Sequence, residues 1–197
     1  MRLTVRLRWE IQNIRHWERA TAGALEDRQR IMVIGSGGAG KSTFARQLAA
    51  MTGLPVIHLD CHYWRPGWER TPTEEWHTMV QEFAAGAEWI IDGNYTNSLP
   101  LRIQRCDAIV FFDFPRRLCL AGVICRRFSA QARPDAAPGC PERLDLEFLK
   151  WVWSYNNESR PRVLEAVRAA SANVETITLR NRADVRRLLG AVGARAV

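Results

Sequence analysis

Residues 30–43 read Arg-Ile-Met-Val-Ile-Gly-Ser-Gly-Gly-Ala-Gly-Lys-Ser-Thr, and this stretch decides the fold. It contains the pattern G-x-x-x-x-G-K-S/T, carried by Gly35, Gly40, Lys41 and Ser42. Glycines let successive backbone N–H groups turn toward one anion, the lysine reaches the β- and γ-phosphates, and the hydroxyl ligates Mg²⁺. We therefore expect a loop that binds the phosphates of ATP, composed of Gly35, Ser36, Gly37, Gly38, Ala39, Gly40, Lys41, Ser42 and Thr43.

The residues on either side of this loop predict a strand before it and a helix after it. Residues 31–34 form a short apolar run, and residues 42–51 place apolar side chains at helical spacing. Gly53 and Pro55 indicate where the helix ends. A helix that begins directly after the loop favours negative charge at its N-terminus, which suits a bound phosphate.

Lysine usage makes the match more specific. The chain has two lysines, Lys41 and Lys150, against 26 arginines, so a generic positive charge in this sequence is an arginine. A compact ammonium therefore stands at the one position where phosphate chemistry calls for it.

Size and composition predict a single globular domain in a reducing compartment. The chain has 197 residues, of which 47% are hydrophobic and 25% charged. No apolar run approaches the roughly 20 residues needed to span a bilayer. The five cysteines are odd in number and form no C-x-x-C pair, which favours free thiols and a cytoplasmic location.

The net charge of +7 raises the question of nucleic acid. Residues 1–30 hold seven arginines and four acids, and residues 102–133 hold seven arginines and two aspartates. The second cluster surrounds the region where a kinase would hold phosphates. A basic site for an anionic substrate therefore explains the charge as well as DNA does.

Residues 1–30 differ in character from the rest of the chain. They are rich in Arg and Trp, with Leu7, Ile11, Ile14 and Trp17 at helical spacing. They predict either an amphipathic helix packed on the body or a translation-start artefact. Acidic residues disfavour a mitochondrial targeting helix. We take residues 31–197 as the main domain.

From residue 30 onward, strand-like and helix-like segments alternate. The predicted strands are residues 31–34, 56–59, 89–91, 108–112 and 174–179. The predicted helices are residues 42–51, 73–85, 116–128, 142–156 and 162–170. This alternation predicts a three-layer α/β fold with a parallel sheet, whose ligands lie beyond the carboxyl ends of the strands.

Three aspartates stand at those strand ends. Asp92 and Asp113 each follow an apolar strand, and either could hold Mg²⁺ through a water, together with Ser42. Asp60 could accept a proton from an attacking hydroxyl or order Mg²⁺ waters; the alternative is a turn or cap residue. The Asp60-Cys61-His62 triplet lacks further ligands at zinc spacing.

Arginines surround a stretch without periodicity. Residues 129–141 contain three prolines and a glycine, which predicts either a mobile lid or a plain surface loop. Arg126 and Arg127 precede this stretch, and Arg160 follows the next helix. These arginines could stabilise the charge of a transferred phosphoryl group; the alternative for Arg160 is a solvated helix end.

A short segment after Asp60 is crowded with aromatic residues. Tyr63, Trp64, Trp68 and Trp76 could line a substrate pocket or form the core of a small subdomain. The core interpretation is favoured for Trp76, and both remain open for Trp64 and Trp68.

Taken together, these motifs make the chain resemble the P-loop kinases related to adenylate kinase and, more narrowly, the bacterial DNA topology modulation proteins. The matching stretches, which fall within residues 31–182, are Ile-Gly-Ser-Gly-Gly-Ala-Gly-Lys-Ser-Thr (34–43), His-Leu-Asp (58–60), Trp-Arg-Pro-Gly-Trp (64–68), Trp-Ile-Ile-Asp-Gly-Asn-Tyr (89–95), Phe-Phe-Asp-Phe-Pro-Arg (111–116), Gly-Cys-Pro-Glu-Arg-Leu-Asp (139–145) and Phe-Leu-Lys-Trp-Val-Trp (148–153).

The resemblance implies a five-stranded sheet of order 2-3-1-4-5, a substrate segment at about 61–88 and a lid at about 129–141. It implies that Asp92, followed by glycine, is the Mg²⁺-associated acid rather than Asp113. Arg126 or Arg127 takes the place of the family's arginine before the lid, and Arg160 that of an arginine after it. The sequence motifs with which adenylate kinases recognise AMP are absent, which points to another acceptor.

We expect an ATP-dependent kinase that acts on a small molecule or nucleotide and uses Mg²⁺. The expected catalytic residues are Lys41, Asp60, Asp92, Arg126, Arg127 and Arg160. The alternative is a regulator or DNA-associated protein that uses ATP as a switch. With no base-reading motif in the sequence, any binding to DNA would be weak and dependent on salt. The acceptor and the oligomeric state stay open.

Overall fold

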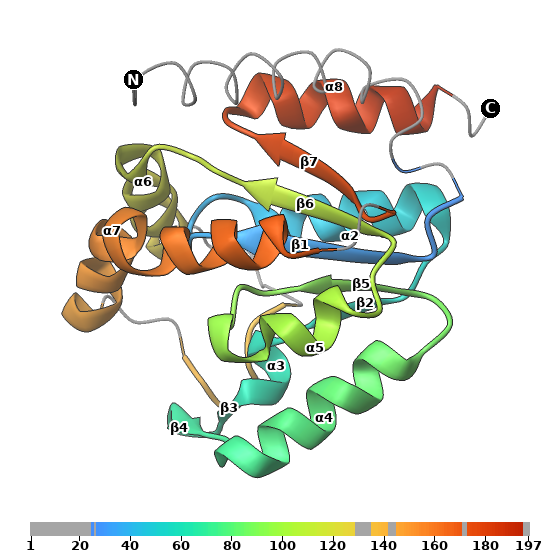
Figure 1. The fold of residues 1–197 in the computed structure, drawn as a ribbon. Helices are drawn as coiled ribbons and strands as arrows, with labels where there is room; N and C mark the ends of the chain where they lie inside the picture. The colour runs from blue at the N-terminus through green and yellow to red at the C-terminus, as the bar shows by residue number, and fades with distance from the viewer. Residues whose placement is uncertain (1–24, 26, 129–134, 142–144, 171–172, 195–197) are drawn as a thin grey trace, which may run out of the picture.

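The computed structural model describes residues 25, 27–128, 135–141, 145–170 and 173–194 (Figure 1). Most of the expected N-terminal extension lies outside these residues, as do the parts of the expected lid at 129–134. Within the described residues, no helix combines the length and the apolar character that crossing a membrane requires.

A parallel sheet forms the centre of the molecule. Its strands are β1 (Arg30–Gly35), β2 (Val56–His58), β5 (Trp89–Asp92), β6 (Ala108–Phe112) and β7 (Glu175–Leu179), in the order β2-β5-β1-β6-β7. All of the pairings are parallel. When the strands of this sheet alone are numbered along the chain, the order is 2-3-1-4-5, so the predicted sheet is confirmed.

Successive side chains of β1 point to opposite faces of the sheet and contribute to two hydrophobic cores, one on each face. Ile31 and Val33 belong to the core that contains Phe44 and Leu48 of α2 (Lys41–Thr52). Met32 and Ile34 belong to the core on the opposite face. Because both faces are covered, the strand is apolar at every inner position, as buried parallel strands are.

The helices supply the outer layers (Figure 1). The first core also receives buried residues of α6 (Arg116–Arg127) and α8 (Arg182–Gly193). The second receives those of α4 (Thr73–Ala85) and α5 (Leu99–Ile103). The helix α7 (Leu146–Arg168) contributes to both, with Val152 in the first core and Val163 in the second. The three-layer α/β arrangement expected from the sequence is therefore present.

Two predictions about helices were wrong. Residues 142–156 and 162–170 do not form separate helices: α7 is one helix of 23 residues with Pro161 inside it. Proline removes one backbone donor, but Val152, Tyr155 and Val163 continue a single buried face past it, so packing outweighs the local cost. The helix α8 was not expected; the Asn181 side chain caps it by accepting a hydrogen bond from the backbone N–H of Asp184.

A small unit follows β2 and carries the aromatic segment. It consists of α3 (Asp60–Tyr63) and the antiparallel strands β3 (Trp64–Arg65) and β4 (Glu69–Arg70), which lead into α4. Trp76 is buried, and its ring meets those of Tyr63 and Tyr95 at centroid distances of 5.0 and 4.9 Å. The core interpretation of Trp76 is confirmed.

Candidate active site

The loop between β1 and α2 has the backbone that anion binding requires. Gly35, Gly38 and Gly40 have φ values of 139°, 74° and 92°, a region that favours glycine. Gly40 is the N-cap of α2 and provides no side-chain hydrogen bond, and the first turn of the helix holds no acidic residue. The first N–H groups of α2 are thus left without a side-chain cap for an anion to bind.

Two helices press against this loop. A Cβ added at Gly38 would lie 2.1 Å from the carbonyl oxygen of Cys119 in α6, and one added at Gly122 would lie 2.1 Å from the carbonyl oxygen of Gly38. On the other side, a Cβ at Gly37 would lie 2.7 Å from the ring of Phe148 in α7. The glycines of the loop therefore permit contact between backbones as well as the turn itself.

Lys41 closes the loop on itself. Its Nζ donates a hydrogen bond to the carbonyl oxygen of Ser36 at 2.9 Å, and the side chain is half-buried. This bond holds the ammonium beside the loop, in reach of any phosphate that the N–H groups bind.

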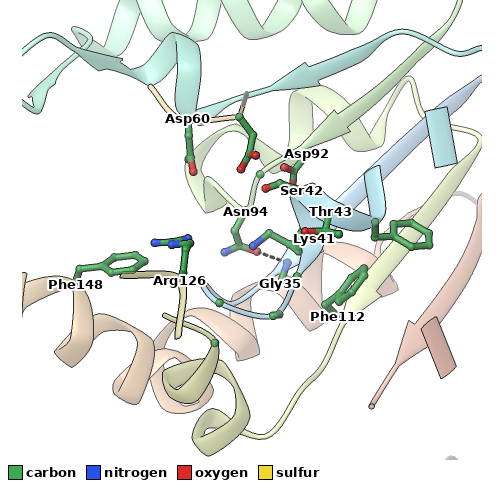
Figure 2. A pocket seen from close by; sticks show the side chains of 18 of the residues that line it. Gly35, Lys41, Ser42, Thr43, Asp60, Asp92, Asn94, Phe112, Arg126 and Phe148 are labelled. Atoms are coloured by element: carbon green, nitrogen blue, oxygen red, sulfur yellow. Dashed lines mark hydrogen bonds between the residues drawn. The ribbon is translucent and has the colours of Figure 1, made fainter. Parts of the chain in front are cut away.

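A cavity of about 1130 Å³ extends from the loop to the small aromatic unit (Figure 2). The residues expected to bind phosphate line it, from Gly35 and Gly37 to Thr43. Asp60, Asp92 and Arg126 line the same cavity. Figure 2 shows the side chains of Asp60, Lys41 and Arg126 around one space. The fold thus brings together residues that lie far apart in the sequence.

Asp92 is the buried acid of this cavity. It is 5% exposed, and its Oδ2 lies 2.9 Å from Nδ1 of His58 at the end of β2. Its Oδ1 has no hydrogen-bond partner among the described residues. A buried carboxylate oxygen left unpaired, with the hydroxyl of Ser42 lining the same cavity, fits a hard cation such as Mg²⁺. The sequence reasoning missed His58.

The described residues contain no group of three or more His, Cys, Asp or Glu side chains that could hold a metal.

Asp113 and Arg160 form an ion pair with each other. Nε and one terminal nitrogen of Arg160 donate to the two oxygens of Asp113 at 2.6 and 2.7 Å, and this bond raises the pKa of Arg160. Neither residue is among those that line the cavity. Arg127 is exposed and does not line it either, whereas Arg126 lies against the ring of Phe148, 5.9 Å from its centroid.

Asp60 faces the cavity from the side opposite the loop. Its Oδ1 accepts a hydrogen bond of 2.6 Å from the hydroxyl of Tyr95. Burial and the charge of Asp60 raise the pKa of Tyr95, so the phenol keeps its proton and remains a donor.

Asn94 connects the end of β5 to the loop. Its Oδ1 accepts hydrogen bonds from the backbone N–H of Gly35 at 3.2 Å and from the hydroxyl of Tyr155 at 3.4 Å. The sequence showed only that Asn-Tyr follows Asp-Gly at this point, and no sequence signal indicated the bond to the loop.

The aromatic residues divide between core and cavity. Trp64 and Trp68 line the cavity, with their rings in an edge-to-face pair 5.5 Å apart. Nε1 of Trp68 donates to the carbonyl oxygen of Pro141 at 3.3 Å. These contacts favour the pocket interpretation of both residues.

Residues 135–141, the described part of the expected lid, contact both sides of the cavity. The carboxylate of Asp135, which is buried, forms an ion pair with Arg46 of α2. The carbonyl oxygen of Gly139 accepts from the N–H of Gly67, in the turn between β3 and β4, at 3.1 Å. Cys61 adds a contact from its Sγ to the carbonyl oxygen of Ala136 at 3.5 Å.

Comparison with known proteins shows the fold. No family model matches the chain. No curated protein matches it either. Among solved structures, a shikimate kinase from Acinetobacter baumannii is 16% identical with a TM-score of 0.59, over 87% of this chain and 94% of that one. A shikimate kinase from Bacteroides thetaiotaomicron is 15% identical with a TM-score of 0.54, over 85% and 97%.

The chain has the α/β fold of P-loop kinases, with the parallel five-stranded sheet predicted from its sequence.

The contact between Gly38 and Gly122 generates the first prediction. Gly122→Ala places a methyl group against a carbonyl oxygen that belongs to the loop, so α6 or the loop must move. We expect the free energy of unfolding to fall by about 1–3 kcal/mol, measured by urea denaturation. Gly190→Ala in α8 is the control: a Cβ there meets nothing within 4 Å, and replacing a helical glycine should stabilise by about 0.5–1 kcal/mol. Equal stability of Gly122→Ala and the unsubstituted protein would contradict the proposed packing.

Proposed function

We propose that the protein is an ATP-dependent phosphotransferase that moves the γ-phosphoryl group of ATP to the hydroxyl of a small molecule. The observation that carries the proposal is the shared cavity, in which the phosphate-type loop faces Asp60 and Tyr95 across one space. A site that only binds nucleotide needs the loop, but it does not need a carboxylate and aromatic walls on the opposite side.

In this proposal the loop and its lysine hold the donor. The N–H groups of residues 35–43 would bind the phosphates, and Lys41 would leave the carbonyl of Ser36 to contact the β- and γ-phosphates. Ser42 and Asp92 would hold Mg²⁺, with Asp92 acting through a water. The ion would neutralise charge that develops on the phosphates during transfer.

The opposite side of the cavity would bind the acceptor. Asp60 would orient the attacking hydroxyl and take its proton, and the rings of Trp64 and Trp68 would contact the carbon skeleton. Of the three predicted arginines, Arg126 lines the cavity, and it would stabilise the transferred group. The roles of Arg127 and Arg160 stay predictions; Arg160 would have to exchange Asp113 for phosphate.

The acceptor class follows from the site and not from the relatives. Two of the similar structures are shikimate kinases, one of them in complex with shikimate. We propose a small hydroxyl-bearing acceptor for this chain as well, in a cytoplasmic protein. Residues 61–88 would form the substrate segment and residues 129–141 the lid, while the role of residues 1–30 stays a prediction.

The regulatory alternative has less support. The narrower resemblance to bacterial DNA topology modulation proteins rests on sequence words alone, and no base-reading element is recognisable among the described residues. A DNA-binding nucleotide switch would not explain the carboxylate of Asp60 and the aromatic side chains on the side of the cavity opposite the loop.

The second prediction tests the donor site. Lys41→Ala should lower phosphoryl transfer by about 10²-fold or more, because the charge that stabilises the transferred group is lost. Lys150→Ala is the matched control, since Lys150 is the other lysine of the chain and is exposed on α7. The assay is ATP consumption by purified protein screened against nucleosides, nucleotides, sugars and small hydroxy acids. Full activity of Lys41→Ala with any acceptor found would reject the assignment.

The third prediction concerns the bond between His58 and Asp92. His58→Ala should raise the Mg²⁺ concentration needed for half-maximal activity, because the Asp92 carboxylate loses the contact that orients it. His58→Asn keeps a side-chain N–H near the position of Nδ1 and should restore much of the Mg²⁺ response. If both variants respond to Mg²⁺ like the unsubstituted protein, His58 does not orient Asp92.

A further inference from the structure

Arg102 of α5 is the most unusual charged residue of the fold. Its side chain is fully buried, at 0% exposure. Burial lowers its pKa to about 10, so the guanidinium still carries its charge in neutral solution. Burying a charge is costly unless strong hydrogen bonds compensate it, and the residues that compensate Arg102 show what it does.

The guanidinium binds a turn of the backbone. One terminal nitrogen donates to the carbonyl oxygen of Gly93 at 2.8 Å, and the other donates to those of Asn94 and Tyr95 at 2.8 and 3.2 Å. Nε donates to the carbonyl oxygen of Ser98 at 3.4 Å. Among the described residues, the hydrogen bonds of Arg102 go to carbonyl oxygens and not to a carboxylate.

The backbone of this turn is strained, and it needs hydrogen-bond donors from outside the turn. Gly93 has a φ of 144° and Tyr95 a φ of 30°, and a positive φ is strained for a tyrosine. Three successive carbonyl oxygens point to one side and need donors there. A planar guanidinium with several N–H groups meets that need, and the single ammonium of a lysine does not.

The turn determines where the Tyr95 hydroxyl lies. The ring of Tyr95 packs against Tyr63 and Trp76, and its hydroxyl donates the 2.6 Å bond to Asp60. A change in the backbone at Tyr95 therefore moves the donor that orients Asp60. The same turn also reaches the phosphate loop, because Asn94 accepts a hydrogen bond from the N–H of Gly35. The loop depends on it less than Tyr95 does, because α6 and α7 support the loop separately at Gly38 and Gly37.

We propose that Arg102 is a positioning residue for the acceptor side of the site, acting through Tyr95 on the carboxylate of Asp60. The inference rests on the proposed function for its catalytic consequence. Arg102 is too deeply buried to touch a substrate, so its effect on transfer is indirect. Phosphoryl transfer therefore requires Arg102, whereas ATP binding depends on it much less.

Kinetics with the acceptor found by the screen provide the first test. Arg102→Lys keeps the charge but loses the planar set of donors, and it should lower kcat by about tenfold or more while the Kd for ATP changes less than threefold. Tyr95→Phe should lower kcat similarly. In the double variant the two losses should not multiply, because both act through one hydrogen bond. Multiplying losses, or an unchanged kcat in Tyr95→Phe, would overturn the proposal.

Arg105→Lys is the matched control. Arg105 follows α5 and is exposed, and we expect kcat and thermal stability to remain unchanged. If Arg102→Lys fails to fold, Tyr95→Phe alone decides the catalytic part, since it removes one hydroxyl and keeps the ring packing.

A second readout needs no activity. In protein labelled with ¹³Cζ-tyrosine, Tyr95→Phe assigns the Tyr95 signal, and Asp60→Asn shows how that signal moves when its acceptor changes. Arg102→Lys should shift the Tyr95 signal in the same direction, and Arg105→Lys should not. An unshifted signal in Arg102→Lys would overturn the inference. A shifted signal in a protein that phosphorylates no acceptor would support the positioning role while the proposed function fails.

Discussion

The loop after β1 keeps its shape because backbone packs directly against backbone on one side of it and aromatic rings pack against it on the other. Gly38 and Gly122 meet where neither can carry a side chain, and Phe148 fills the space beside Gly37. This packing holds α6 and α7 against the loop between β1 and α2. A loop fixed before any ligand arrives presents its N–H groups without reorganising, which is what electrostatic binding of phosphate requires.

The end of β5 supports both sides of the cavity. Within four residues, Asp92 contacts His58, Asn94 accepts the N–H of Gly35, and Tyr95 donates to Asp60. Parallel neighbours make this geometry available, because β5 lies between β2 and β1 and their carboxyl ends share one edge. A single strand end therefore carries a contact to each side of the cavity, through Asn94 to the loop and through Tyr95 to Asp60.

The sequence predicted the strands well because they are short, largely apolar runs, three of which are followed by an aspartate, while the strand order came from the family resemblance. It missed α8, although Val185, Leu188 and Val192 recur there at helical spacing. It also missed the continuity of α7 past Pro161, which depends on a face buried by tertiary packing. His58 and Arg102 were missed for a different reason. Their roles depend on contacts with residues 34 positions away or with backbone carbonyls, and no motif records those contacts.

The net charge of +7 does not by itself show what the individual arginines do. Arginines that seemed to form one basic cluster have separate roles: Arg102 is buried among carbonyl oxygens, Arg116 lies 4.1 Å over the ring of Trp153, and Arg126 faces the cavity. Elsewhere, acidic partners hold arginines on the surface and at the cavity, as Asp107 holds Arg30. Each of these four arginines is thus engaged in a contact of its own. A small anionic ligand needs only a few cations around it, and the cavity provides them in Lys41 and Arg126.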